Sequence, residues 1–252
     1  MTIQFCSDLH LEFPENKDYL KTHLLDPVGD ILVLAGDVVP FGLLERERAF
    51  FDFCSDHFRM TYWLPGNHEY YGSDIAERSG HLEESIRENV HLVNQVTVFQ
   101  EGVRLVFSSL WSRIPPGHAL EIEGRLNDFR MIKFRGNRFT PEVYNQFHEQ
   151  NREFLRKVIT ANHQGPTLVV SHHVPTFFHY PAQYQGEILN EAFASELYDF
   201  IEGSTVDYWI FGHHHCNIAD FRIGKTLLVT NQVGYVRYGE QSGFKNNRTI
   251  PF

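Results

Sequence analysis

Five short apolar runs, each followed at once by polar residues that can bind a metal, constrain this chain more than any other feature. The runs are residues 3–6, 31–35, 61–64, 167–170 and 208–211. Their length and composition are typical of buried strands. In open α/β sheets, the carboxyl ends of parallel strands meet at one edge, where ligands bind. We therefore expect the five polar clusters to form a single site.

The clusters combine carboxylates, imidazoles and one amide. In chain order they are Ser7-Asp8-Leu9-His10, Gly36-Asp37, Gly66-Asn67-His68-Glu69, Ser171-His172-His173 and Gly212-His213-His214-His215. This set suits divalent transition metals such as Mn, Fe, Co, Ni or Zn, and contains too much nitrogen for calcium. A lone Asp after a strand is more often a turn former or a helix cap. A role in turns or helix caps does not account for five such clusters, each directly after an apolar run.

Helical patterns fall between the apolar runs. Three stretches have the apolar periodicity of helices, and they are residues 43–58, 141–159 and 188–201. Thr140 is a good N-cap, and Pro141 suits the first helical position. Two pairs of runs are spaced like hairpins, namely 96–100 with 104–108 and 218–222 with 226–230. Strands that alternate with helices and carry added hairpins predict an α/β sandwich.

The ordered clusters resemble the calcineurin-like metallophosphoesterase superfamily, whose pattern is D-x-H, G-D, G-N-H-[DE], H and G-H-x-H. All five blocks occur in this order between residues 8 and 215, and the ordered set is highly specific. The resemblance implies a four-layer α/β/β/α sandwich, in which two mixed sheets are flanked by helices. We expect residues 1–252 to form one domain of this type. Residues 111–139 have little periodicity and are either a lid or an insertion without a role.

The resemblance also implies two divalent metal ions and seven ligands. These are Asp8, His10 and His215 at the first ion, Asn67, His172 and His213 at the second, and Asp37 between the two. A carboxylate can bridge because each of its oxygens can face one ion. Alternation along a continuing strand would place Asp8 and His10 on the same side. The neighbouring His173 and His214 are not counted as ligands.

The implied reaction is hydrolysis of a phosphoester, with Asp37, Asn67 and His68 as the catalytic residues. Two ions about 3.5–4 Å apart can share a hydroxide and aim it in line at phosphorus. His68 follows Asn67 without being needed as a ligand, and we take it as the general acid for the leaving oxygen. Glu69 either supports the His68 imidazole or begins a helix, and the sequence favours neither role.

The sequence narrows the substrate only in part. A formal net charge of −10 favours a small phosphorylated substrate over nucleic acid, which binds to Lys and Arg clusters. A nuclease acting on single strands is nevertheless an alternative, as is a non-catalytic binding protein that keeps the fold. The superfamily's protein phosphatases carry G-D-x-V-D-R-G, but Pro40 and Phe41 replace the Asp and Arg here. Loss of that Arg slightly favours a phosphodiester over a phosphomonoester.

The remaining features predict a cytoplasmic protein. No apolar run approaches the roughly 20 residues that span a bilayer, and no leader with a basic and then an apolar part is visible. The cysteines Cys6, Cys54 and Cys216 lack a CxxC spacing, which indicates reduced thiols. The tail at residues 233–252 shows no periodicity. Residues 231–235 resemble an N-P-x-G-Y run with Gln232 at the Pro position, and we draw no role from them. The sequence does not indicate the oligomeric state.

Overall fold

All five apolar runs form strands in the computed structural model, which describes residues 1–252. These strands are β1 (Thr2–Cys6), β2 (Ile31–Ala35), β3 (Met60–Leu64), β10 (Thr167–Val170) and β11 (Tyr208–Ile210). β1, β2 and β3 pair in parallel, and so do β10 and β11. Because parallel strands end at the same edge, the polar clusters leave each sheet on one side.

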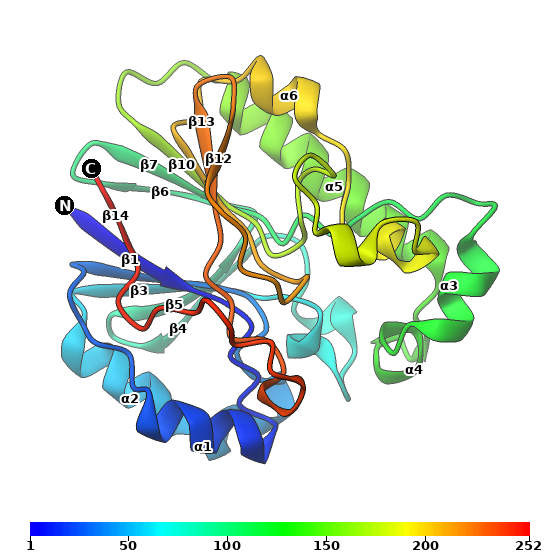
Figure 1. The fold of residues 1–252 in the computed structure, drawn as a ribbon, viewed down its shortest axis with the longest axis horizontal. Helices are drawn as coiled ribbons and strands as arrows, with labels where there is room; N and C mark the ends of the chain where they lie inside the picture. Colours follow the sequence, from blue (N-terminus) through cyan, green and yellow to red (C-terminus); the bar gives the residue numbers. More distant parts are fainter.

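The strands form two six-stranded sheets that face each other (Figure 1). Their strand orders are β14-β1-β2-β3-β5-β4 and β12-β13-β11-β10-β7-β6. The other strands are β4 (Leu82–Arg87), β5 (Val90–Asn94), β6 (Val96–Gln100), β7 (Val103–Phe107), β12 (Phe221–Ile223), β13 (Thr226–Val229) and β14 (Thr249–Pro251). Both sheets mix parallel and antiparallel pairs. The two expected hairpins are confirmed as β6–β7 and β12–β13.

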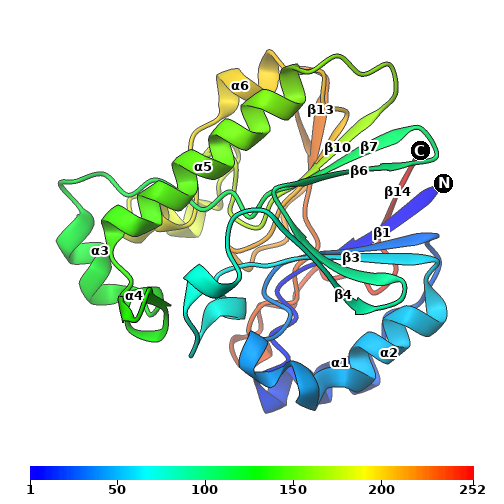
Figure 2. The ribbon, with the colours of Figure 1, turned by 180° about the vertical axis from the view of Figure 1, so that it is seen from behind.

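Helices cover the outer face of each sheet, as Figures 1 and 2 show from opposite sides. α1 (Pro14–Thr22) and α2 (Arg48–His57) pack on the first sheet, and α5 (Pro141–Thr160) and α6 (Tyr198–Glu202) pack on the second. A third apolar cluster fills the space between the sheets. The predicted α/β/β/α sandwich is therefore confirmed. None of the helices has the length and hydropathy needed to cross a membrane.

Three local expectations differ from the structure. The helix expected at residues 188–201 is wrong, because a 3₁₀ helix covers only Ile188–Ala192 and α6 begins at Tyr198. Between them, the backbones of Phe193 and Ser195 bond to Val174 instead, which holds the chain extended. The first half of the helix expected at residues 43–58 is also a 3₁₀ helix, Phe41–Glu47. The aperiodic tail contains β14, which pairs with β1.

Residues 111–139 are folded and packed. They contain α3 (Ala119–Arg125), α4 (Asp128–Met131) and a small hairpin of β8 (Lys133–Phe134) and β9 (Asn137–Arg138), and they lie beyond one end of α5 (Figure 1). An apolar cluster joins the segment to α5 and to the loops after β3. Its members are Tyr70, Ile75, Trp111, Ile114, Ile122, Phe129, Ile132, Phe139, Tyr144, Phe147 and Ala192.

This packing predicts unequal effects of two truncations in the same segment. Phe139 is fully buried, whereas Leu120 is 86% exposed. We expect Phe139→Ala to lower the free energy of unfolding by about 3–5 kcal/mol, and Leu120→Ala to change it by less than about 0.5 kcal/mol. Equilibrium unfolding in urea measures both values. Equally small effects would show that the segment adds little to the folded core.

Candidate metal centre

The polar clusters leave their strands through turns rather than by continuing as strands. Five of the predicted ligands have positive φ angles, which are 56° at Asp8, 48° at His10, 53° at Asp37, 77° at His213 and 51° at His215. Residues with side chains rarely adopt this region. The expected strand alternation from Asp8 to His10 is wrong, since β1 ends at Cys6. Left-handed turns bring the two side chains together instead.

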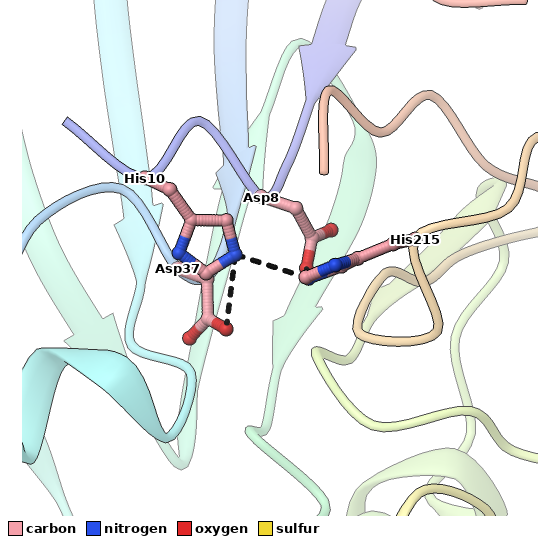
Figure 3. Close-up of side chains that lie close together, drawn as sticks. All are labelled: Asp8, His10, Asp37 and His215. Atoms are coloured by element: carbon pink, nitrogen blue, oxygen red, sulfur yellow. Dashed lines mark hydrogen bonds and ion pairs between the residues drawn. The ribbon is translucent and has the colours of Figure 1, made fainter. Parts of the chain in front are cut away.

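Four side chains form the first group, which Figure 3 shows. His10 Nε2 lies 3.0 Å from His215 Nε2 and 3.8 Å from Asp37 Oδ2. His215 Nε2 also lies 3.3 Å from Asp8 Oδ1. Imidazole nitrogens that face each other among carboxylate oxygens have the geometry of ligands to one cation. The donor set fits a divalent transition metal.

The second group lies next to the first and shares Asp37 with it. His172 Nε2 lies 3.1 Å from His213 Nδ1, 3.4 Å from Asp37 Oδ2 and 3.3 Å from Asn67 Oδ1. These residues come from both sheets, because Asp37 and Asn67 follow β2 and β3, whereas His172 and His213 follow β10 and β11. The structure thus brings all seven predicted ligands together in two overlapping groups.

Two glycines make room for this approach. A Cβ atom on Gly66 would collide with Asp37 Oδ1 and lie 2.6 Å from His172 Nε2. A Cβ atom on Gly212 would lie 2.6 Å from Asp8 Oδ2. Any larger residue at either position would displace a predicted ligand. Glycine is therefore required at both positions, because a side chain there would occupy the space of a ligand.

Charges within the centre set the protonation of its ligands. Burial opposes ionisation of Asp37, but the neighbouring His172 and His68 hold the pKa of its carboxyl well below the usual range. Burial likewise opposes charge on His215, yet Asp8 and Glu240 raise the pKa of its imidazole to about 10. A metal ion must displace the proton on His215, so metal binding strengthens as the pH rises.

His68 lies beside the two groups and is held at both ring nitrogens. Nδ1 is 2.8 Å from Glu12 Oε1, and Nε2 is 3.1 Å from the Tyr235 hydroxyl. Glu12 Oε1 also lies 3.1 Å from His10 Nδ1, so one carboxylate joins a predicted ligand to His68. Burial lowers the pKa of His68, but Asp37 and Glu12 outweigh burial and raise it above its ordinary value. A protonated imidazole beside the metal groups is suited to donate a proton.

Glu69 does not support His68. Its fully buried carboxylate accepts four hydrogen bonds, from the backbone N–H groups of Asp37, Val38 and Gly66 and from the indole of Trp63. Glu69 therefore fastens the loop after β3 to the loop after β2. The carboxylate that supports His68 is Glu12, which comes from the loop after β1.

Asp128 fixes the orientation of one predicted ligand. Asn67 donates a hydrogen bond from Nδ2 to Asp128 Oδ1 at 2.9 Å, and the Tyr71 hydroxyl donates to the same oxygen at 2.7 Å. Because the amide nitrogen is engaged, Asn67 Oδ1 faces His172. Asp128 is buried at the start of α4, so residues 111–139 contribute directly to the site.

The two histidines left out of the ligand set lie outside both groups. His173 bonds through Nδ1 to the backbone carbonyl of Ser109 and through Nε2 to the Tyr144 hydroxyl. His214 accepts a hydrogen bond at Nδ1 from the Gln232 side chain. Both imidazoles are buried and structural.

Sequence reasoning missed four side chains of the site, which are Glu12, Asp128, Tyr235 and Glu240. Glu12 carries a weak signal, because it follows His10 with the same spacing that separates His10 from Asp8. Tyr235 ends the run that resembles N-P-x-G-Y, from which no role was drawn. Asp128 and Glu240 lie in aperiodic segments and carry no local signal. Their roles follow only from tertiary contacts.

Comparisons with known proteins agree with the fold. The model of a family described as calcineurin-like phosphoesterase matches residues 1–217. An uncharacterised protein of Acanthamoeba polyphaga mimivirus, L509, is 28% identical over 259 residues, covering 92% of this chain and 91% of that protein.

Two solved structures are also similar. Phosphopantetheinyl hydrolase (PptH) from Mycobacterium tuberculosis has a TM-score of 0.72 at 17% identity, over 99% of this chain and 95% of that one. A dimetal phosphatase from Danio rerio has a TM-score of 0.48 at 18% identity, over 92% of this chain and 87% of that one. The similarity to PptH extends over nearly the whole fold.

The bond between Asn67 and Asp128 predicts a selective loss of metal. In Asp128→Ala the amide of Asn67 is free to rotate, so we expect affinity at the second group to fall by about 10–100-fold, with a smaller change at the first group. Metal analysis after dialysis against graded chelator measures both affinities. Unchanged retention of both ions would show that Asn67 is held without Asp128.

Proposed function

The chain belongs to the calcineurin-like phosphoesterase family, and on this premise we propose that it hydrolyses esters of phosphate in small organic molecules. It does so with two divalent transition-metal ions, one in each group. The observation that carries the proposal is the overlap of the two groups at Asp37, because its Oδ2 lies 3.8 Å from His10 Nε2 in one group and 3.4 Å from His172 Nε2 in the other. The intact set of seven side chains, with His68 beside them, disfavours a protein that only binds its ligand.

The two ions, when bound, lower the pKa of a water molecule and stabilise negative charge that develops on the phosphoryl oxygens. The chain's own side chains do the rest. Asp37 and Asn67 orient the centre from the first sheet, and His172 and His213 do so from the second. Their burial excludes competing solvent from the reacting atoms.

His68 supplies the proton that the leaving oxygen needs. Glu12 accepts the Nδ1 hydrogen and keeps the imidazole positively charged, and Nε2 points toward the Tyr235 hydroxyl. Tyr235 thereby fixes the direction of the Nε2 proton. No covalent bond between enzyme and phosphate is needed in this scheme.

The substrate is proposed to be small. PptH, whose fold is similar, is a phosphopantetheinyl hydrolase, and a 4′-phosphopantetheine ester is therefore a candidate substrate for this chain. Single-stranded nucleic acid is the second candidate of the same reaction class. The net charge of −10 weighs against it.

Metal removal tests the requirement for two ions. We expect purified protein to hold close to two transition-metal ions per chain, and exhaustive chelation to abolish hydrolysis of bis(p-nitrophenyl) phosphate. Addition of Mn²⁺, Co²⁺ or Zn²⁺ should restore it. Metal analysis and initial rates are measured on the same samples. Full activity in metal-free protein would contradict the proposal.

His68→Ala tests the proton donor separately from metal binding. We expect kcat to fall by about 10²–10⁴-fold, with metal content unchanged, because His68 is in neither ligand set. Glu12→Gln keeps the imidazole but removes the charge that supports it, so a smaller fall in kcat is expected. Wild-type rates in His68→Ala would remove this residue from the mechanism. A fully metallated but inactive wild-type protein would favour the non-catalytic alternative.

A further inference from the structure

The metal centre opens into a cavity of about 340 Å³. Four predicted ligands line it, and they are Asp37, Asn67, His213 and His215. Aromatic and aliphatic side chains from the stretch after β10 also line it, and they are Tyr180, Tyr184, Leu189 and Phe193. A phosphoryl group at the metals therefore has space for one organic substituent on this side.

A second cavity, of about 750 Å³, adjoins the first. His68, Tyr71, Asn127 and Tyr235 line both cavities, but none of the seven predicted ligands lines the second. His68 therefore stands at the boundary between a cavity that reaches the metals and one that does not. Both volumes are in the range of about 300–1,000 Å³ that is usual for small-molecule sites.

The second cavity presents apolar side chains to solvent. Phe13, Met131 and Tyr238 line it and are 36%, 45% and 70% exposed. They are three of the eight large hydrophobic side chains that are exposed in the whole chain. Exposed apolar groups gathered beside a catalytic site are typical of a ligand-binding surface. Their chemistry suits an apolar or aromatic substituent.

Charge distinguishes a diester from a monoester. A monoester dianion gains from a cationic side chain at its extra oxygen. Arg125 is the only Arg or Lys that lines the first cavity, and it is paired with Glu121 at 3.0 Å and with Glu187 at 3.4 Å. The first cavity therefore offers no free guanidinium or ammonium to a second negative charge.

Building on the proposed function, we propose that the substrate is a phosphodiester whose two ester arms occupy separate cavities, and that the apolar arm in the second cavity is the leaving group. A monoester has one arm and leaves one cavity empty. In-line attack places the leaving oxygen opposite the attacking water, and the second cavity is the one that none of the predicted ligands lines. His68 borders that cavity.

The step balances as a hydrolysis. The oxygen of the attacking water forms a bond to phosphorus, and the bond between phosphorus and the ester oxygen of the second-cavity arm breaks. That oxygen keeps the electron pair and takes the Nε2 proton of His68. The water's proton passes to solvent, which reprotonates His68. The products are a phosphomonoester, which stays at the metals, and an alcohol, which leaves through the second cavity.

A bulky substitution in each cavity tests the assignment. Gly42 lines the second cavity, and a Cβ atom there meets nothing within 4 Å, so Gly42→Trp should fold and fill the space. Gly117 is equally unobstructed and lines neither cavity, so Gly117→Trp is the matched control. Leu189→Trp narrows the first cavity. Thermal unfolding and metal content verify each variant.

The substrates are methyl p-nitrophenyl phosphate and bis(p-nitrophenyl) phosphate, which share a leaving group and differ in the arm that is retained. We expect Gly42→Trp to lower kcat/KM at least about tenfold for both, and Leu189→Trp to lower it at least about fivefold more for the bis ester. Gly117→Trp should match the wild type. Tyr238→Ala, in case Gly42→Trp misfolds, should raise KM severalfold for both esters.

Three results would overturn the inference in different ways. Unchanged kinetics in both Gly42→Trp and Tyr238→Ala would remove the second cavity from the site. If Gly42→Trp discriminates between the esters and Leu189→Trp does not, the two arms are assigned to the wrong cavities. If the wild type hydrolyses p-nitrophenyl phosphate but neither diester, the substrate class is wrong while the proposed function stands. Inactivity of the fully metallated wild type on all three esters would overturn the proposed function itself.

Discussion

The arrangement of the two sheets depends on one group, the Asp37 carboxylate, which contacts residues of both. It follows β2 in the first sheet, yet it lies 3.4 Å from His172, which follows β10 in the second. It also accepts a hydrogen bond from the backbone N–H of His68 at 2.9 Å. One buried carboxylate therefore fixes the spacing of the two sheets at their ligand-bearing edge and the start of the segment that carries His68.

That arrangement is held against backbone strain. The five predicted ligands with positive φ angles each cost about 1–3 kcal/mol, and such residues persist only where surrounding contacts over-determine them. Glu69 is one such contact, because three backbone N–H groups from two loops and the indole N–H of Trp63 in β3 converge on its carboxylate. A fully buried acid away from the reaction thus stabilises the geometry of the reacting groups. Backbone strain at the strand ends lowers the stability of the fold. It is retained because it gives the ligand side chains their positions.

The strands and the ligand clusters could be predicted because each is encoded locally, by an apolar run and the polar residues that follow it. The helix expected at residues 188–201 failed because Val174, distant in sequence, offers its backbone hydrogen bonds to the same stretch. Glu12, Asp128 and Tyr235 escaped prediction for a related reason. Glu12 and Tyr235 act on His68, and Asp128 acts on Asn67. Tertiary folding alone brings these partners near, so no spacing in the sequence marks the pairs.

Residues 111–139 connect the two cavities to the candidate metal centre. Asp128 holds the amide of Asn67, the adjacent Asn127 lines both cavities, and Met131 lies one helical turn further along the second. A change in this segment that reshapes a cavity therefore also shifts the support of a predicted ligand. The clusters at the strand ends resemble the motifs of the family and would set the proposed reaction. Under the proposed function, the segment beside them would couple the shape of the substrate to the position of Asn67, and specificity and turnover are expected to change together.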